Sequence, residues 1–230
     1  MTLRLIGNRA YQFCSDFVQL VITQLKITAF FSYFEIKKTS AGNGLGLAWM
    51  LLEPMLRISI YVFVFTVVFQ IRLPGDDAGT FSYAVYILMG LVPWIYISAV
   101  LTDGAGLVHS YAGFIRQPRF PYKILPNVIL VKHLPAHLVG MAVLLVMIII
   151  SGDFDKINFP LLILVYMLMV LTVRGSATFL GACAAVLPDV RYLVGIVLML
   201  AIYLSPVLYV PEMLGKWLFV GLLNPFSYVL

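Results

Sequence analysis

Three charged side chains stand inside long apolar stretches of this sequence, and they are the first candidates for chemistry. Glu53 and Arg57 lie four residues apart, which places them on one helical face where they can pair. One interpretation is a pair that neutralises itself near the membrane interface. The other is a contact for an anionic headgroup at a substrate entrance, to which Trp49, one helical turn earlier, would also belong. Arg174 needs a partner or water, because an unpaired charge in apolar surroundings is costly. It is either a hydrogen-bonding hub or part of a transport pathway.

The residue patterns of enzymes and metal sites are weak in this chain. His133 and His137 share a helical face, but HLPAH has no glutamate and has Pro135 between the histidines, so we expect packing and no metal. The glycine-rich stretch at 42–47 follows no predicted strand, and the sequence has no GxxxxGK[ST] phosphate loop. We find no Ser/His/Asp set or carboxylate pair with a common location. We therefore expect a chain that is not an enzyme and carries no cofactor.

The composition is that of an integral membrane protein. Of the 230 residues 62% are hydrophobic and 11% are charged, whereas a soluble domain has about a quarter charged residues. The net charge of +5 is small and does not indicate nucleic-acid binding. Cys14 and Cys183 are far apart without CxxC spacing, so we expect no disulfide. The first residues lack the pattern of a removable signal peptide.

Five stretches hold the roughly 20 apolar residues that a helix needs to cross a bilayer. We predict an all-α membrane fold with spans at 47–70, 81–102, 124–150, 158–187 and 191–210. The chain, 1–230, then forms a single transmembrane domain. Its parts are a cytoplasmic segment at 1–46, the transmembrane helices at 47–210 and an outer or re-entrant segment at 211–230.

Two flanking segments are expected at membrane surfaces. Within 13–34 the apolar residues lie opposite a polar face formed by Gln12, Asp16, Gln19, Thr23 and Lys26. This pattern favours a helix lying flat in the cytoplasmic headgroup layer, with a poor extra span as the alternative. After the fifth span, prolines and a glycine divide the tail into pieces too short to cross the bilayer, so we expect short re-entrant or interfacial helices there.

Lysine and arginine are unevenly distributed among the loops, and this distribution predicts the orientation. Nine of them fall before the first span, in the second loop and in the fourth loop: Arg4, Arg9, Lys26, Lys37, Lys38, Arg116, Arg119, Lys123 and Arg191. The alternate loops hold only Arg72 and Lys156. We therefore predict a multi-pass protein of the cytoplasmic (inner) membrane with its N-terminus in the cytoplasm.

The stretch GFIRQPRFPYKILP, residues 113–126, is unusually polar for this chain. It combines three basic residues with three prolines: Arg116, Arg119, Lys123, Pro118, Pro121 and Pro126. The basic residues indicate a cytoplasmic loop, and the prolines stiffen it by restricting φ. A stiff loop can transmit force to a partner. The alternative is a loop that only orients the protein.

Aromatic residues are abundant around the first and fifth spans, among them Tyr61, Phe65, Tyr203 and Tyr209. Most aromatic side chains in membrane proteins pack or anchor at interfaces. If the substrate is a sugar, their faces can instead stack on sugar rings and line its path.

Six stretches, in order along nearly the whole chain, resemble ABC-type polysaccharide export permeases. They are EIKKTSAGNGLGLAWMLLEP (35–54), GLVPW (90–94), FIRQPRFPYKILP (114–126), LPDVRY (187–192), YLSPVLYVPEML (203–214) and LNPFSYV (223–229). Each motif alone is weak, but six at the right separations are specific.

This resemblance implies a homodimeric permease subunit that pairs with two copies of a separate ATP-binding subunit, which carries ATP and magnesium. Such permeases export lipid-linked polysaccharide of the O-antigen, capsule or teichoic acid type. The stiff loop resembles the family's coupling helix, which gives ATPase-coupling roles to Phe114, Arg116, Pro118, Arg119, Phe120 and Pro121. For such a substrate, the path would include Tyr61, Phe65, Tyr203, Tyr209 and Arg174, and the headgroup entrance Trp49, Glu53 and Arg57.

The sequence departs from the family pattern in two places. A sixth span after the NPF region is absent, which points to an incomplete chain, and SAGNG at 40–44 stands where an arginine-rich stretch is common. Other functions stay open. One is a drug or simple-lipid exporter of the same superfamily. An integral membrane enzyme acting on lipid-linked sugars would need clustered acids or histidines, and a secondary transporter would need a better ion relay than Arg174 alone.

Overall fold

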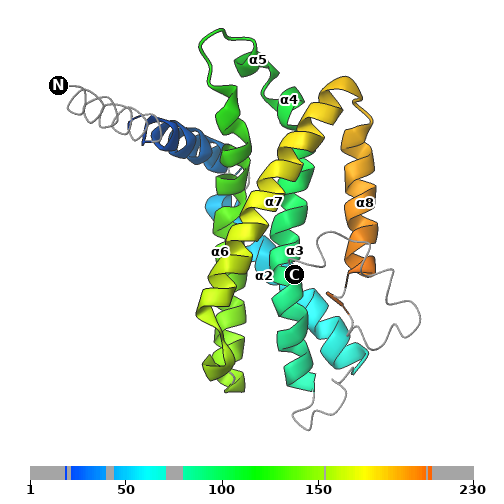
Figure 1. Cartoon of the computed structure of the whole chain (residues 1–230). Coiled ribbons are helices and arrows are strands. Elements are labelled where there is room, and N and C mark those ends of the chain that lie inside the picture. The colour runs from blue at the N-terminus through cyan, green and yellow to red at the C-terminus, as the bar shows by residue number, and fades with distance from the viewer. Residues whose placement is uncertain are drawn as a thin grey trace, which may run out of the picture.

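The computed structural model describes residues 19, 22–39, 44–70, 80–152, 154–205 and 207–208, and these residues form a helical bundle without strands (Figure 1). An N-terminal helix covers 22–39. The bundle helices are α2 (Trp49–Val62), α3 (Thr80–Ala105), α6 (Leu125–Ser151), α7 (Phe159–Val186) and α8 (Val190–Leu204). The short helices α4 (Leu107–Ser110) and α5 (Ala112–Ile115) lie between α3 and α6. The predicted all-α membrane fold is confirmed.

Short turns extend these helices. Turns of 3-10 helix, Gly46–Ala48, Tyr122–Ile124 and Phe154–Lys156, precede α2, α6 and α7, and a π-helical turn, Phe63–Val68, continues α2. Local sequence explains several helix ends. The Leu161 amide donates to the Asn158 side chain at 3.2 Å and caps the start of α7. α6 ends at Gly152, whose φ of 78° suits glycine.

Among the residues that the structure describes, four helices are long and apolar enough to cross a bilayer: Trp49–Val68, Tyr83–Ala105, Tyr122–Ser151 and Phe159–Val186. They agree with the first four predicted spans to within a few residues. The fifth span, predicted at 191–210, is shorter in the structure. α8 has 15 residues, about 22 Å at 1.5 Å per residue, whereas the hydrocarbon core is about 30 Å thick. It ends at Ser205, whose backbone is extended (ψ 149°) because the next residue is a proline.

Parts of some predictions lie outside the described residues. These are 13–18, 20 and 21 of the predicted interface helix, position 209 of the substrate path, and the segment 211–230. The predictions for those positions stay predictions.

α3 is the central helix of the bundle. In the most apolar stretch of α3, 67% of the residues are buried, whereas the corresponding share is 11–22% in the other three long helices. It contacts α2, α6, α7 and α8, and Figure 1 shows it between α6 and α8. Its fully buried side chains form the middle of the core: Tyr83, Ile87, Leu88, Leu91, Ile97, Val100 and Leu101. The surrounding helices expose apolar side chains outward, as helices bordered by lipid do.

Small residues let α3 and α7 touch. A Cβ atom added at Gly104 would lie 2.6 Å from the Cβ of Ala177, and one added at Gly181 would lie 2.8 Å from the Gly104 carbonyl oxygen. Small side chains allow helix backbones to approach closely inside membranes. The crossing of these two helices therefore depends on glycine at positions 104 and 181.

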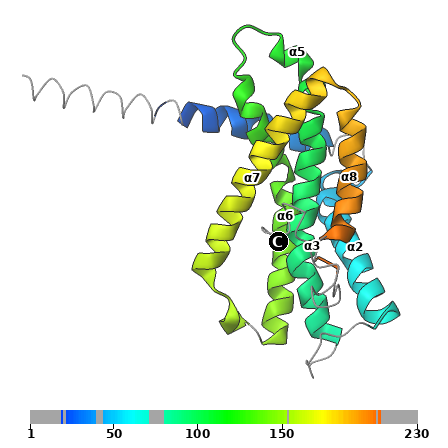
Figure 2. The same ribbon diagram turned by 45° about the vertical axis from the view of Figure 1, so that its right-hand side comes forward.

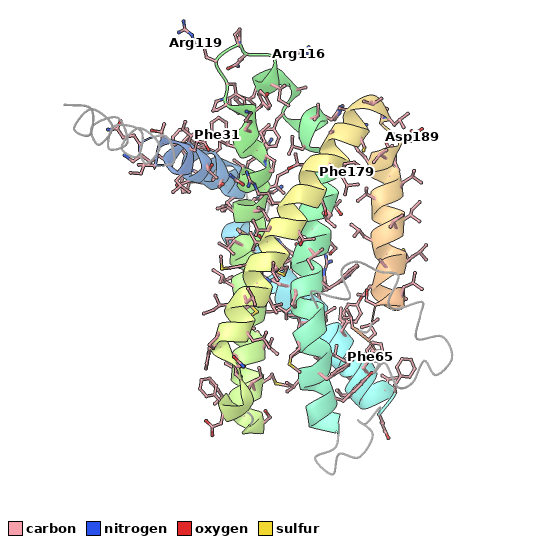
Figure 3. The ribbon with its side chains drawn as sticks, in the orientation of Figure 1. Phe31, Phe65, Arg116, Arg119, Phe179 and Asp189 are labelled. Atoms are coloured by element: carbon pink, nitrogen blue, oxygen red, sulfur yellow. The ribbon has the colours of Figure 1, made fainter. Side chains whose placement is uncertain are left out.

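Three segments lie at one end of the bundle: the N-terminal helix, the connection from α4 to the start of α6, and the turn between α7 and α8 (Figures 1 and 3). Arg116, Arg119 and Asp189 mark this end in Figure 3. We call it the basic end and define it by residues 22–39, 106–124 and 187–190. The turn between α6 and α7 lies at the opposite end. The structure thus agrees with the alternation inferred from the basic residues, while the side of the membrane that each end faces stays a prediction.

The N-terminal helix runs across the bundle axis instead of along it (Figure 2). Thr28 and Ser32 are buried on its inner face, where the Ser32 hydroxyl donates to the Thr28 carbonyl at 2.7 Å. Phe30, Tyr33 and Phe34 are exposed. This orientation and these aromatic side chains suit a helix in the headgroup layer, as the sequence predicts.

Candidate functional site

The tip of the loop between α5 and α6 carries the two arginines predicted to couple the chain to a partner. Arg116 and Arg119 are exposed there (Figure 3). The Phe120 amide donates to the Gln117 carbonyl at 3.1 Å, and Pro118 lies inside this turn. Pro121 follows with φ −80°. Backbone hydrogen bonds and prolines together restrict the loop, so the predicted stiffness has a structural basis.

Two loop phenylalanines pack against the N-terminal helix. The Phe31 ring lies edge-on to Phe114 and Phe120, with centroid separations of 5.6 and 5.3 Å. The rings of Phe114 and Phe120 are 5.5 Å apart. We call these three residues the aromatic cluster. Edge-to-face geometry is favourable for aromatic pairs, so two predicted coupling residues have a defined partner, Phe31, that the sequence did not single out.

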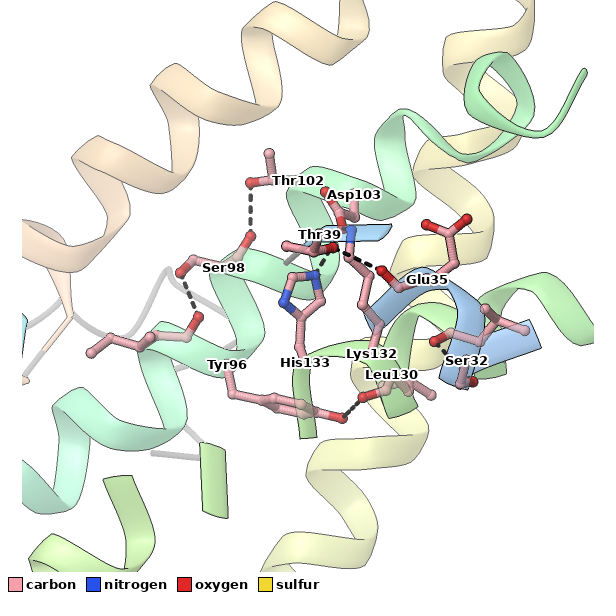
Figure 4. Close-up of polar contacts among 12 residues, drawn as sticks. Ser32, Glu35, Thr39, Tyr96, Ser98, Thr102, Asp103, Leu130, Lys132 and His133 are labelled. Atoms are coloured by element: carbon pink, nitrogen blue, oxygen red, sulfur yellow. Dashed lines mark hydrogen bonds and ion pairs between the residues drawn. The ribbon is translucent and has the colours of Figure 1, made fainter. Parts of the chain in front are cut away.

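An ionic cluster joins α3 to α6 beside the N-terminal helix (Figure 4). The Asp103 Oδ2 atom accepts hydrogen bonds from Lys132 Nζ at 2.7 Å and lies 2.8 Å from His133 Nε2. All three side chains are partly buried, with exposed fractions of 35%, 21% and 23%. Asp103 was not among the site residues predicted from the sequence, because the predicted second span ends at residue 102. The sequence does contain a signal for this cluster. Asp103 directly follows the second apolar stretch, and Lys132 and His133 are adjacent cationic or titratable residues in the third.

The ionic cluster forms one wall of an open cavity of about 360 Å³. Glu53 and Arg57 of α2 line the same cavity, and their side chains pair at 2.8 Å as predicted. Ile36 and Thr39 of the N-terminal helix also line it. Trp49, predicted at the same entrance, is 41% exposed and is not a lining residue. The cavity therefore combines two carboxylates, two cations and a histidine where four helices meet.

A second cavity, of about 340 Å³, lies on the other side of Asp103 and Lys132. Glu35, Lys38 and Thr39 of the N-terminal helix line it together with Tyr111, which is 6% exposed. Burial, and then the charge of the nearby Glu35 carboxylate, raise the pKa of Tyr111. Tyr111 therefore stays a neutral donor at physiological pH.

The two histidines have different surroundings, although they share a helical face. His133 belongs to the ionic cluster. His137 is buried one turn further along α6, where its ring lies 4.6 Å from that of Tyr96 and 5.7 Å from that of Tyr166. Packing describes His137, as expected from the sequence, whereas His133 has an ionic partner that the sequence did not predict.

Comparison with known proteins places the chain in a family. The profile described as "ABC-2 type transporter" matches residues 17–230. The chain belongs to this family. It is 28% identical to the O-antigen export system permease protein RfbA of Myxococcus xanthus, over 76% of this chain and 65% of that protein. It is also 22% identical to the O-antigen export system permease protein RfbA of Klebsiella pneumoniae, over 79% of this chain and 68% of that protein. It is 23% identical to the polysialic acid transport protein KpsM of Escherichia coli, over 85% of this chain and 74% of that protein.

The aromatic residues predicted for a substrate path occupy different positions in this ABC-2 chain. Tyr61 and Phe65 are partly buried against the core, and the Phe65 ring lies 6.5 Å from that of Tyr83. Tyr203 is 59% exposed on α8. The role of these three residues in a path stays a prediction.

Arg174 lies on an exposed face of α7 in the ABC-2 chain. Its carbonyl accepts a hydrogen bond from the Thr178 hydroxyl at 2.8 Å. Within the part of the chain that the structure describes, its guanidinium has no hydrogen bond or ion pair. The described helices therefore do not supply the partner that the hub interpretation requires, and the pathway interpretation stays a prediction.

Proposed function

We propose that this chain is the membrane permease subunit of an ATP-driven exporter that moves lipid-linked polysaccharide across the cytoplasmic membrane. The observation that carries the proposal is the similarity to three proteins named for O-antigen export or polysialic acid transport, over 76%, 79% and 85% of this chain. The family match over residues 17–230 supports the same class. The substrate is then a lipid-linked glycan of the O-antigen, capsule or teichoic acid type.

ATP hydrolysis would take place on a partner chain. This sequence has no phosphate-binding loop, so ATP and magnesium are assigned to a separate ATP-binding subunit in two copies, with this chain as a homodimer. The exposed arginines and the restricted backbone of the loop at the basic end support its role as the docking element. In this proposal the basic end faces the cytoplasm, which agrees with the excess of lysine and arginine there.

The cavity between Glu53, Arg57 and the ionic cluster is the proposed entrance for the substrate headgroup. Its cations, Arg57 and Lys132, suit phosphate oxygens, and its carboxylates and hydroxyls suit sugar hydroxyls. Hydrogen-bonding groups gathered at the membrane surface can replace the water lost when a polar headgroup enters. The aromatic residues of α2 and α8 would then contact the glycan along its path.

Depletion of the chain in its native cell tests this proposal. Without the exporter, lipid-linked polymer should accumulate in the cytoplasm and disappear from the cell surface, as detected by antibody or lectin labelling of intact and permeabilised cells. Restoring the wild-type gene should reverse both changes. A change in drug sensitivity or membrane lipid content with normal surface polymer would instead support an exporter of drugs or simple lipids.

A further inference from the structure

The N-terminal helix and the segment from α4 to the start of α6, about 80 residues apart in the sequence, meet at two points. One is the aromatic cluster, where Phe31 contacts both Phe114 and Phe120. The other lies about one helical turn further along the N-terminal helix, where Glu35 and the buried Tyr111 line the same polar cavity. The aromatic contacts therefore join the two segments beside a polar cavity that both of them line.

The same helix forms part of the lining of both polar cavities. Ile36 and Thr39 line the cavity that holds Glu53 and Arg57, and Glu35, Lys38 and Thr39 line the cavity that holds Tyr111. These residues follow Phe31 within about two helical turns. A displacement of the loop that carries Phe31 along would therefore change the shape of both cavities.

We infer that the N-terminal helix and the loop move as one body, and that Phe31 is the positioning residue that transmits loop movement to the headgroup entrance. This inference rests on the proposed function, since it needs a partner that pushes on the loop. Phe31 touches neither the substrate nor the partner in this account. It acts through Phe114 and Phe120, whose backbone belongs to the stiff loop.

An exposed phenylalanine on the same helix, Phe34, provides a matched control. Phe34 is 51% exposed, and its ring contacts are with Phe30 and Tyr33, both on the N-terminal helix. Removing its ring takes away a similar area without touching the loop. Phe31→Ala and Phe34→Ala therefore differ in whether the two elements stay joined.

The first experiment compares ATP hydrolysis with export in proteoliposomes that contain the complete complex. Phe31→Ala should lower glycan export per ATP hydrolysed by about tenfold, because two edge-to-face ring contacts are lost, while ATP hydrolysis continues. Phe34→Ala should keep the wild-type ratio, and Phe31→Tyr, which keeps the ring, should restore most of it. A wild-type ratio in Phe31→Ala would overturn the inference.

A second experiment asks whether a covalent link between the helix and the loop can replace the lost ring contacts. Phe31→Cys and Phe114→Cys are combined in a chain whose Cys14 and Cys183 are replaced by serine, and the pair is bridged with a short bifunctional thiol reagent. The unbridged variant lacks two rings of the aromatic cluster, so its export per ATP hydrolysed should be low. If the helix and the loop move as one body, bridging them should restore export. Loss of export on bridging, with recovery when a cleavable reagent is cut, would show that the two must move apart.

The wild-type complex separates the two levels of the proposal. If it shows no ATP-dependent glycan export, the proposed function is wrong. If it exports and the Phe31 and cross-linking results are both negative, only the joined movement is wrong.

Discussion

At the scale of single residues, one carboxylate organises the polar interior of the basic end. Asp103 Oδ2 holds both Lys132 and His133 within 2.8 Å. When the carboxylate beside a partly buried cation is removed, the cation is still partly desolvated but no longer has an opposite charge to offset that cost. The consequences of losing Asp103 should therefore exceed those of losing an exposed acid.

Asp103→Asn should lower the free energy of unfolding by about 1–2 kcal/mol. This is less than the roughly 1.5–3 kcal/mol typical of hydrogen bonds to charged groups, because the cluster is partly hydrated. Denaturant titration of the purified protein in detergent measures this change. Asp155→Asn, at an exposed acid of the opposite end, is the matched control. A double-mutant cycle with Lys132→Met isolates the pair, and additive single effects would mean that no coupling exists.

Arg57 is predicted to matter for transport more than for stability. An exposed pair at i and i+4 contributes about 0.3–0.5 kcal/mol, and Glu53 and Arg57 have side chains 66% and 51% exposed. Arg57→Gln should change unfolding by less than about 0.5 kcal/mol but lower export about tenfold, because a charge-assisted contact to the headgroup is lost. Glycan export in proteoliposomes provides the readout, and unchanged export would remove Arg57 from the entrance.

At the scale of helices, the contact between α3 and α7 depends on the missing side chain of Gly104. Gly104→Ala places a Cβ 2.6 Å from that of Ala177, so the helices must separate. Overpacking of this kind costs about 1–3 kcal/mol. Gly175→Ala is the control, since a Cβ there meets nothing within 4 Å. Thermal unfolding should show a lower midpoint for the first variant alone, and equal midpoints would contradict the close crossing.

At the scale of the whole molecule, the two ends of the bundle should face different compartments. Single cysteines placed at positions 117 and 155, in a cysteine-free chain, test the orientation. A membrane-impermeant thiol reagent added to intact spheroplasts should label position 155 and should label position 117 only after permeabilisation. The reverse pattern would invert the topology and remove the coupling loop from the cytoplasm.

Charge reversal at the loop tip tests the connection to an ATP-binding subunit. Arg116→Glu combined with Arg119→Glu should reduce ATP hydrolysis of the reconstituted complex to the level of the ATP-binding subunit alone, since like charges would replace complementary ones at the docking surface. Lys156→Glu, at the opposite end, serves as the control. Wild-type hydrolysis and assembly in the double variant would leave the loop with an orienting role only.

Much of this architecture was predictable from residue order. Apolar runs of about 20 residues must become helices in a bilayer, because backbone groups find no other partners there. The first four spans, the pairing of Glu53 with Arg57 and the shared end of the basic segments follow from such local rules and agree with the structure. The length of α8 was harder to predict, because an apolar pattern continues past the residue where the helix ends.

The sequence by itself determined that the chain is a bundle of membrane helices with a stiff basic loop, since hydrophobicity, charge and proline act over a few residues. Only the tertiary structure decided which side chains meet. Asp103 reaches Lys132 and His133, and Phe31 reaches Phe114 and Phe120, across gaps of 29 to 89 residues. Such contacts depend on the angle and rotation at which helices pack, which the side chains of the whole bundle set together.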